Sequence, residues 1–421
     1  MIEQTAVQPN VLLVGVSEKK TSDFEYAMDE LQSLAEANMF MIVDSIKQNS
    51  ESSDRKTYVG KGKLMEIKEF CENNEIDIII FNDELTPSQT RNIEEVISDV
   101  EIMDRTRLIL DIFASRAQTK EAKLQVMISS LEYDLPRLGG SYEALSRQGG
   151  SSTLRSRGGG ETKLESDRRV IEAQIAKYRR ELKKLVQERQ TQRSKRKKSD
   201  TKTVALVGYT NVGKSTLMNA LLDDDSDKKV YVEDMLFATL QTRVRRVELT
   251  DKKWCLLTDT VGFVDNLPHH LIKAFRSTLE EVKEADLLLH VIDSTSPHIN
   301  HHKRVTLQTL QAIGVEDTPI LEVYNKVDKS NENYDDSMKI AISAKNGYGL
   351  ERLKQEITQL LYKDYKVYQL LIPYEMGNIV HMLSEQYETK ILENREDGIL
   401  LETSIPSTVA NKYKMYITKT I

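Results

Sequence analysis

The sequence predicts a multidomain protein of the α/β class. The chain has 421 residues, which exceeds one ordinary hydrophobic core and favours two to four domains. Short apolar strands alternate with amphipathic helices near the start and again beyond residue 200, and long helices lie between. We therefore expect an N-terminal α/β subdomain at 1–105, a long antiparallel helical hairpin at 106–198, a central doubly wound sheet at 201–364 and a small α+β domain at 365–421.

The composition fits a soluble protein and excludes several classes. Apolar residues make up 39% of the chain and charged residues 30%, with a net charge of −7. The two cysteines, Cys71 and Cys255, have no CxxC spacing, so neither a disulfide framework nor a zinc site is expected, and a cytoplasmic location is predicted. The first eight residues do not resemble a secretory signal, and the apolar runs have strand length, so no membrane span is predicted.

The N-terminal subdomain is predicted from alternating strands and helices. Strands are expected at Val11–Val16, Met39–Ser45 and Ile76–Phe81, and Phe24–Ala35 has apolar residues at helical spacing. Thr86 followed by a proline predicts a capped helix start.

The predicted hairpin has an apolar stripe on each helix. Leucines and one methionine from Leu124 to Leu138 fall on one face, and apolar residues from Leu164 to Leu185 follow a heptad spacing. The connection at 139–162 contains seven glycines, with Arg147, Arg155 and Arg157 between them. Such a loop is either functional or a plain linker.

Charge gathers in the same stretch. Residues 137–198 hold 18 basic and 7 acidic residues in an otherwise acidic chain, which indicates phosphate contact or, alternatively, a solvated helix face.

A phosphate-binding loop follows the strand Thr203–Val207 and precedes a helix at Thr216–Leu222, as the GxxxxGK[ST] pattern requires. Its residues are Gly208, Tyr209, Thr210, Asn211, Val212, Gly213, Lys214 and Ser215. The loop's N–H groups would converge on phosphates, Lys214 would place its charge by the β- and γ-phosphates, and Ser215 would offer its hydroxyl to Mg²⁺.

Three further segments complete a predicted guanine-nucleotide site, each after a strand. Asp259 would hold a water bound to Mg²⁺, and the Gly262 amide would meet the γ-phosphate. A carboxylate at Asp328 accepts both guanine N1–H and the amino group, which adenine cannot match. The segments are Asp259, Thr260, Val261 and Gly262; Asn325, Lys326, Val327 and Asp328; and Ser343, Ala344 and Lys345.

A γ-phosphate-sensing loop is expected between Ser215 and Asp259. Thr239 and Thr242 are both candidates as a second Mg²⁺ ligand, and Thr239 is preferred because flanking apolar groups would anchor the loop. The loop residues are Phe237, Ala238, Thr239, Leu240 and Gln241. Lys214, Thr239 and Gly262 are the predicted catalytic set.

Hydrolysis requires a positioned water, and many GTPases place a glutamine directly after the DxxG segment. Phe263 occupies that position here and cannot orient water, which predicts slow intrinsic turnover and stimulation by a partner. His298, His301 and His302 have no carboxylate or cysteine at ligand spacing and are predicted to be surface residues.

Segments along nearly the whole chain resemble the signature segments of the HflX GTPases. They are Asn82–Gln89, Asp104–Ala114, Lys123–Val126, Leu145–Gly150, Gly160–Glu165, Leu236–Leu240, Asp259–Phe263 and Ala285–His290. The resemblance implies a Mg²⁺-dependent GTPase that is stimulated by ribosomes, binds the 50S subunit and splits stalled or idle 70S ribosomes under stress. It also implies that the hairpin docks on 23S rRNA and that the glycine-rich loop reaches toward the peptidyl-transferase centre. The predicted RNA contacts are Arg147, Arg155, Arg157, Lys163, Arg168, Arg169, Arg179 and Arg180.

Three departures from the family pattern leave alternatives open. Arg107 stands where the family has glycine, Gly159 replaces a proline, and the tip Ser151–Ser156 is two residues longer than usual. A longer tip suits a subgroup that confers resistance to antibiotics of the peptidyl-transferase centre. A third hypothesis is a signalling switch with a protein effector, which would not need the clustered charge.

Overall fold

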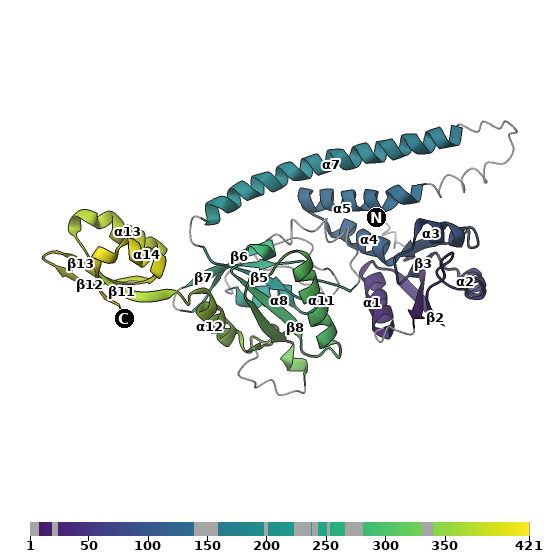
Figure 1. The fold of residues 1–421 in the computed structure, drawn as a ribbon. Coiled ribbons are helices and arrows are strands. Elements are labelled where there is room, and N and C mark those ends of the chain that lie inside the picture. Colours follow the sequence, from purple (N-terminus) through teal and green to yellow (C-terminus); the bar gives the residue numbers. More distant parts are fainter. Residues whose placement is uncertain are drawn as a thin grey trace, which may run out of the picture.

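The computed structural model confirms the multidomain α/β class. It describes residues 8–18, 24–138, 159–197, 201–222, 237, 243–250, 253–265, 281–330 and 340–420, with side chains of the longest helix described at 165–188. Within these residues the strands form three sheets, which follow one another along the chain (Figure 1). No helix among them is both long and apolar enough to cross a bilayer.

The first sheet is parallel and has the strand order β2-β1-β3-β4. Its strands are β1 (Asn10–Glu18), β2 (Met41–Ser50), β3 (Ile78–Phe81) and β4 (Glu101–Asp104). The accompanying helices are α1 (Phe24–Ala37), α2 (Lys61–Asn74), α3 (Pro87–Glu94) and α4 (Arg105–Arg116). We call Asn10–Arg116 the N-terminal unit, because α4 shares a core with α1 and β1.

Two local predictions in this unit have different outcomes. The helix start at Thr86 is confirmed, because its side chain accepts from the Gln89 N–H and forms a capping box. The strand predicted at Met39–Ser45 is misplaced, since Met39 has a φ of 61° and the strand runs from Met41 to Ser50. Its polar second half escaped the apolar pattern because β2 is an edge strand, exposed along much of its length.

The helical hairpin consists of α5 (Lys120–Asp134), with the short helix η1 (Leu135–Arg137), and α7 (Gly159–Lys197). The helices α5 and α7 lie side by side (Figure 1), and Arg179 of α7 pairs with Glu132 at 2.6 Å. Among the α7 side chains that the structure describes, Ile175 of the predicted seam is buried. The hairpin is therefore the predicted helical pair.

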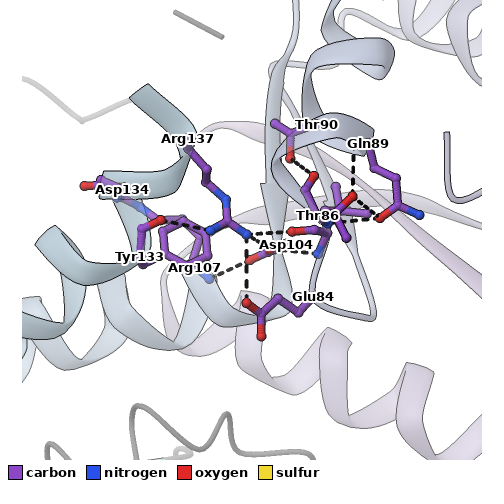
Figure 2. Close-up of polar contacts among 10 residues, drawn as sticks. Glu84, Thr86, Gln89, Thr90, Asp104, Arg107, Tyr133, Asp134 and Arg137 are labelled. Atoms are coloured by element: carbon purple, nitrogen blue, oxygen red, sulfur yellow. Dashed lines mark hydrogen bonds and ion pairs between the residues drawn. The ribbon is translucent and has the colours of Figure 1, made fainter. Parts of the chain in front are cut away.

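A polar joint fixes the end of the hairpin to the N-terminal unit (Figure 2). The Arg137 guanidinium donates to the Leu85 carbonyl at 2.6 Å and lies 3.6 Å above the Tyr133 ring. Asp104 accepts the Leu85 N–H at 3.0 Å, and burial raises the pKa of this carboxyl. Arg107 bonds to Asp134 at 3.2 Å and so links α4 to α5.

The central sheet has the order β10-β9-β8-β5-β7-β6, with β6 antiparallel to β7 and the other pairs parallel. Its strands are β5 (Thr203–Val207), β6 (Arg243–Glu248), β7 (Trp254–Asp259), β8 (Leu287–Asp293), β9 (Ile320–Asn325) and β10 (Ile340–Ala341). The helices are α8 (Lys214–Leu221), α11 (Ile299–Ala312), η2 (Val327–Lys329) and α12 (Leu350–Leu361). Because parallel strands end at one edge, the polar segments after them come together there.

The C-terminal sheet is antiparallel, in the order β12-β13-β11-β14. Its strands are β11 (Tyr365–Ile372), β12 (Thr389–Arg395), β13 (Gly398–Pro406) and β14 (Ile417–Thr420). The helices are η3 (Tyr374–Met376), α13 (Gly377–Gln386), α14 (Ser407–Lys412) and η4 (Lys414–Tyr416). The sheet has an apolar core of its own.

Candidate guanine-nucleotide site

The predicted phosphate loop joins the end of β5 to the start of α8. Gly213 caps α8 with a φ of 91°, and an added Cβ would lie 2.4 Å from the Asn325 amide nitrogen. At Gly208, φ is 149° and a Cβ would lie 2.4 Å from the Val291 carbonyl oxygen. Both positions require glycine, because the backbone conformation and the space each exclude a side chain.

Lys214 lies buried inside the loop. Its ammonium donates to the backbone carbonyls of Gly208 at 3.1 Å and Tyr209 at 2.7 Å. Burial lowers the pKa of the Lys214 ammonium to about 8, although the Asp259 carboxylate opposes the shift. The loop thus holds a desolvated cation whose bonds to carbonyls can be exchanged for bonds to phosphate oxygens.

Ser215 and Asp259 meet at the same edge of the sheet. The Ser215 hydroxyl donates to Asp259 Oδ2 at 2.7 Å, which joins the start of α8 to the end of β7. A hydroxyl and a carboxylate side by side are hard oxygen donors of the kind that Mg²⁺ prefers. The residues present therefore fit a Mg²⁺ ion.

The segment after Asp259 lies directly against the phosphate loop. Thr210 donates its N–H to the Phe263 carbonyl at 2.8 Å, and Phe263 donates its own to the Gly208 carbonyl at 3.1 Å. Phe263 is buried in the apolar cluster that also contains Phe113 of the N-terminal unit. The Phe263 side chain therefore contributes to packing and does not orient a water.

Asn325 ties the two halves of the predicted site together. Its amide nitrogen donates to the Val212 carbonyl at 2.9 Å, and its oxygen accepts the Ala344 N–H at 3.0 Å. Asn325 is only 2% exposed, so both bonds are shielded from water. The side chain positions the loop and the Ser343–Lys345 segment relative to each other.

Asp328, the residue predicted to bind guanine, follows β9 at the same edge of the central sheet. Asp328, in η2, accepts the Ser343 hydroxyl at 2.6 Å, which holds the carboxylate in one orientation. Lys326 donates to the Asn211 carbonyl at 2.7 Å and pairs with Asp293 at 2.7 Å. These bonds hold the segment predicted to bind the base against the phosphate loop.

Asp293 was missed by sequence reasoning. Burial acts to raise the pKa of the Asp293 carboxyl, but the hydrogen bonds from Lys326 and Thr295 together outweigh it, so the pKa is lowered. The available signal was a polar residue that ends a buried strand, the position at which parallel sheets place site residues.

Some predicted residues fall outside the described part of the chain. These are Ala238, Thr239, Leu240, Gln241, Arg147, Arg155, Arg157 and the side chain of Lys163. Phe237 is described, with a φ of 56°, and it packs edge-on against Phe113 with the ring centroids 4.6 Å apart. Among the remaining predicted residues, Thr260 and Val261 are buried, Val327 begins η2, and Lys345 is exposed in the turn after Ser343.

Four arginines predicted to contact RNA lie on α7 and are exposed. Arg168 pairs with Glu172 at 3.0 Å, Arg169 with Glu165 at 2.6 Å, and Arg179 with Glu132 of α5. Arg180 donates to a carbonyl of its own helix at 3.2 Å. Exposed pairs of this kind contribute little stability, so they can be exchanged for other partners.

The histidines do not lie where we expected. His302 is only partly exposed and stacks on Tyr209 with centroids 4.1 Å apart, and it shares a 2.7 Å bond with Tyr26 of α1. Burial lowers the pKa of His302 to about 4. The prediction of surface residues is wrong, because these side chains fill the contact between the N-terminal unit and the central sheet, which local sequence does not show.

Family models match three consecutive parts of the chain. The model described as the N-terminal region of GTP-binding GTPases matches residues 25–114, and that of their middle region matches 116–196. The model described as a 50S ribosome-binding GTPase matches residues 203–326.

Similar proteins are found over most of the chain. The GTPase HflX of Caldanaerobacter subterraneus subsp. tengcongensis is 44% identical over 398 residues, which covers 93% of this chain and 90% of the relative. That of Lacrimispora saccharolytica is 39% identical over 413 residues, or 97% and 96% of the two chains. A crystal structure of a GTP-binding protein from Sulfolobus solfataricus in complex with GDP is 26% identical, with a TM-score of 0.44, and covers 84% of this chain and 99% of that one. By the identity and coverage of these curated relatives, the chain is a GTPase and belongs to the HflX family.

Proposed function

We propose that this GTPase works on the ribosome: it binds GTP with Mg²⁺ at the edge of the central sheet, docks on the 50S subunit through the basic helix α7, and splits stalled or idle 70S ribosomes. The observation that carries the docking step is the set of exposed arginines on α7, a helix that packs on α5 and is not part of the central sheet (Figure 1). The proposal is also supported by the family model described as a 50S ribosome-binding GTPase, which matches residues 203–326.

Each part of the nucleotide has a matching group. The Lys214 ammonium would bind the β- and γ-phosphates, and the Gly262 amide would donate to the γ-phosphate. Ser215 and Asp259 would hold Mg²⁺, which supplies positive charge against the phosphates. Asp328, oriented by Ser343, would accept the guanine N1–H and amino donors.

Catalysis by the chain alone should be slow. Phe263 is buried, so the position after Gly262 supplies no group that could align a water with the γ-phosphorus. We infer that docking on the ribosome completes the site. GTP turnover should therefore rise strongly on addition of 50S subunits or 70S ribosomes, and full turnover without ribosomes would contradict this.

Docking through α7 is attributed to phosphate contacts. The pairs Arg168–Glu172 and Arg169–Glu165 have side chains that are 48–75% exposed, so their strength is screened by water and salt. RNA phosphates can replace the glutamates at little cost, and the released counterions make such binding dependent on salt.

The test is ribosome pelleting across a salt series. Neutralising Arg168, Arg169, Arg179 and Arg180 to glutamine should weaken binding and reduce the salt slope by about 0.9 for each RNA phosphate that the variant no longer neutralises, while GTP affinity stays unchanged. A matched control neutralises four exposed lysines of the C-terminal part, Lys363, Lys366, Lys390 and Lys412, which changes the net charge equally. If both variants weaken ribosome binding to the same extent, α7 is not the docking surface.

Two alternatives are separated by the same assays. If the chain is a resistance factor, shortening 151–156 by two residues leaves pelleting intact but changes translation in the presence of drugs that act at the peptidyl-transferase centre. If the chain splits ribosomes, light scattering shows loss of subunit separation in that variant. A signalling switch predicts no salt-dependent pelleting at all, even with the GTP-bound parent.

A further inference from the structure

A buried polar cluster joins the N-terminal unit to the phosphate loop. Its centre is the hydroxyl of Tyr209, the residue that follows the first glycine of the loop. This hydroxyl donates to the Glu30 carboxylate of α1 and accepts the Asp265 N–H at 2.9 Å. The other Glu30 oxygen pairs with Arg105 of α4, which also donates to the Asp265 carbonyl at 3.4 Å. We call these four residues the Tyr209 node.

The node is shielded from water. Tyr209 is 3% exposed, Glu30 5% and Arg105 4%. Burial, followed by the charge of Glu30, raises the pKa of the Tyr209 hydroxyl well above its usual range, so the hydroxyl keeps the proton that it donates. A buried carboxylate is costly unless it is fully paired, and here its partners come from two different parts of the chain.

The Tyr209 node is part of the predicted nucleotide site at the phosphate loop and at the segment after Asp259. Tyr209 supplies one of the carbonyls that hold Lys214, and its neighbours Gly208 and Thr210 form the backbone bonds to Phe263. Asp265 lies two residues beyond Phe263. Displacement of the segment after Asp259 therefore stretches the bonds from Asp265 to Tyr209 and Arg105.

A γ-phosphate would need such a displacement, because the place predicted for it is closely packed. A Cβ built on Gly262 would lie 2.8 Å from Thr210 Cα and 3.1 Å from the Lys214 ammonium nitrogen. Gly262 thus lies close against the loop, where the γ-phosphate would have to lie between its amide and Lys214. GDP has no γ-phosphate and leaves this contact in place.

We propose that Glu30 and Arg105 of the N-terminal unit are positioning residues for the nucleotide site: through Tyr209 and Asp265 they hold the segment after Gly262 against the phosphate loop and so favour GDP over GTP. By linkage, GTP would loosen the hold of the N-terminal unit on the phosphate loop to the same extent. The inference rests on the proposed nucleotide site and adds the element through which nucleotide state reaches the N-terminal unit.

The experiment measures affinities of the full chain for GDP and for a non-hydrolysable β,γ-imido analogue of GTP by calorimetry. Glu30→Gln and Tyr209→Phe should each shift the preference toward the GTP analogue by about fivefold or more, the usual lower range for coupled sites. The double variant should show the same shift as either single variant, because both break one node. If Glu30→Gln fails to fold, Tyr209→Phe remains the test, because it removes one hydroxyl and leaves the Glu30–Arg105 pair in place.

The matched control is Tyr58→Phe. Tyr58 is also 3% exposed, and its hydroxyl donates to Asp83 within the N-terminal unit, away from Tyr209. It should leave the preference between the two nucleotides unchanged.

Variants that weaken both nucleotides equally, or shift the ratio no more than Tyr58→Phe, would overturn the coupling. Failure of the parent to bind either nucleotide would instead overturn the proposed site.

Discussion

The most informative single change at the base pocket is Asp328→Asn. In the structure, Asp328 Oδ1 accepts the Ser343 hydroxyl at 2.6 Å, and acceptor capacity remains for the two guanine donors. Asparagine has the same shape but replaces one acceptor oxygen by an NH₂ group. That group would face the guanine amino group, donor against donor.

The expected cost follows from the bonds that are changed. Loss of one bond to a charged acceptor costs about 1.5–3 kcal/mol, and an unpaired donor at the contact adds about 1–3 kcal/mol. Together these costs are about 2.5–6 kcal/mol, which corresponds to a loss of GTP affinity of about 10²- to 10⁴-fold. Xanthosine triphosphate should recover much of this loss, because its carbonyl accepts from the new NH₂ group while N1–H still meets the side-chain oxygen.

The assay is calorimetric titration of parent and variant with both nucleotides. The control is Ser343→Ala, which removes the orienting hydroxyl and should weaken GTP by about fivefold, or about 1 kcal/mol, without a change of preference. Unchanged guanine selectivity in Asp328→Asn would refute the assignment of Asp328 as the base reader, and so would an equal switch in Ser343→Ala.

Two further predictions concern Lys214 and Arg137. The pKa of Lys214 is lowered to about 8 and the phosphates need the charged form, so GDP affinity should fall as pH rises, becoming about fourfold weaker at pH 8.5 than at pH 7. Calorimetry measures GDP affinity against pH for the parent and for Lys214→Arg, whose guanidinium stays charged and should bind GDP without this pH dependence. The same pH profile in both proteins would refute the prediction. Arg137→Ala should destabilise the joint of Figure 2 by about 2–4 kcal/mol, because it removes a charged hydrogen bond and a cation–π interaction. Hydrogen exchange should then quicken around Leu85 and in α5 but not in β5, with Arg137→Lys intermediate. Equal exchange rates in the parent and in both variants would contradict this.

Elements with strong local signals could be predicted from the sequence. The strand Thr203–Val207 matches its predicted bounds, because it is a buried parallel strand with a continuous apolar run. The start at Thr86 was predictable because capping involves residues within one helical turn. The bounds of the edge strand β2 could not be predicted, because its pairing with β1 determines its length and its side chains need not be apolar.

The sequence by itself predicted the phosphate loop, because such a loop depends on the backbone freedom of a few consecutive positions such as Gly208 and Gly213. Only the tertiary structure decided which residues from other parts of the chain contact the predicted nucleotide-site residues. Asp293 reaches Lys326 across neighbouring strands, and Glu30 meets Tyr209 over a separation of 179 residues. Such contacts leave no periodic pattern in the sequence. They arise because whole helices and strands pack together and because a buried charge is costly unless it has a partner.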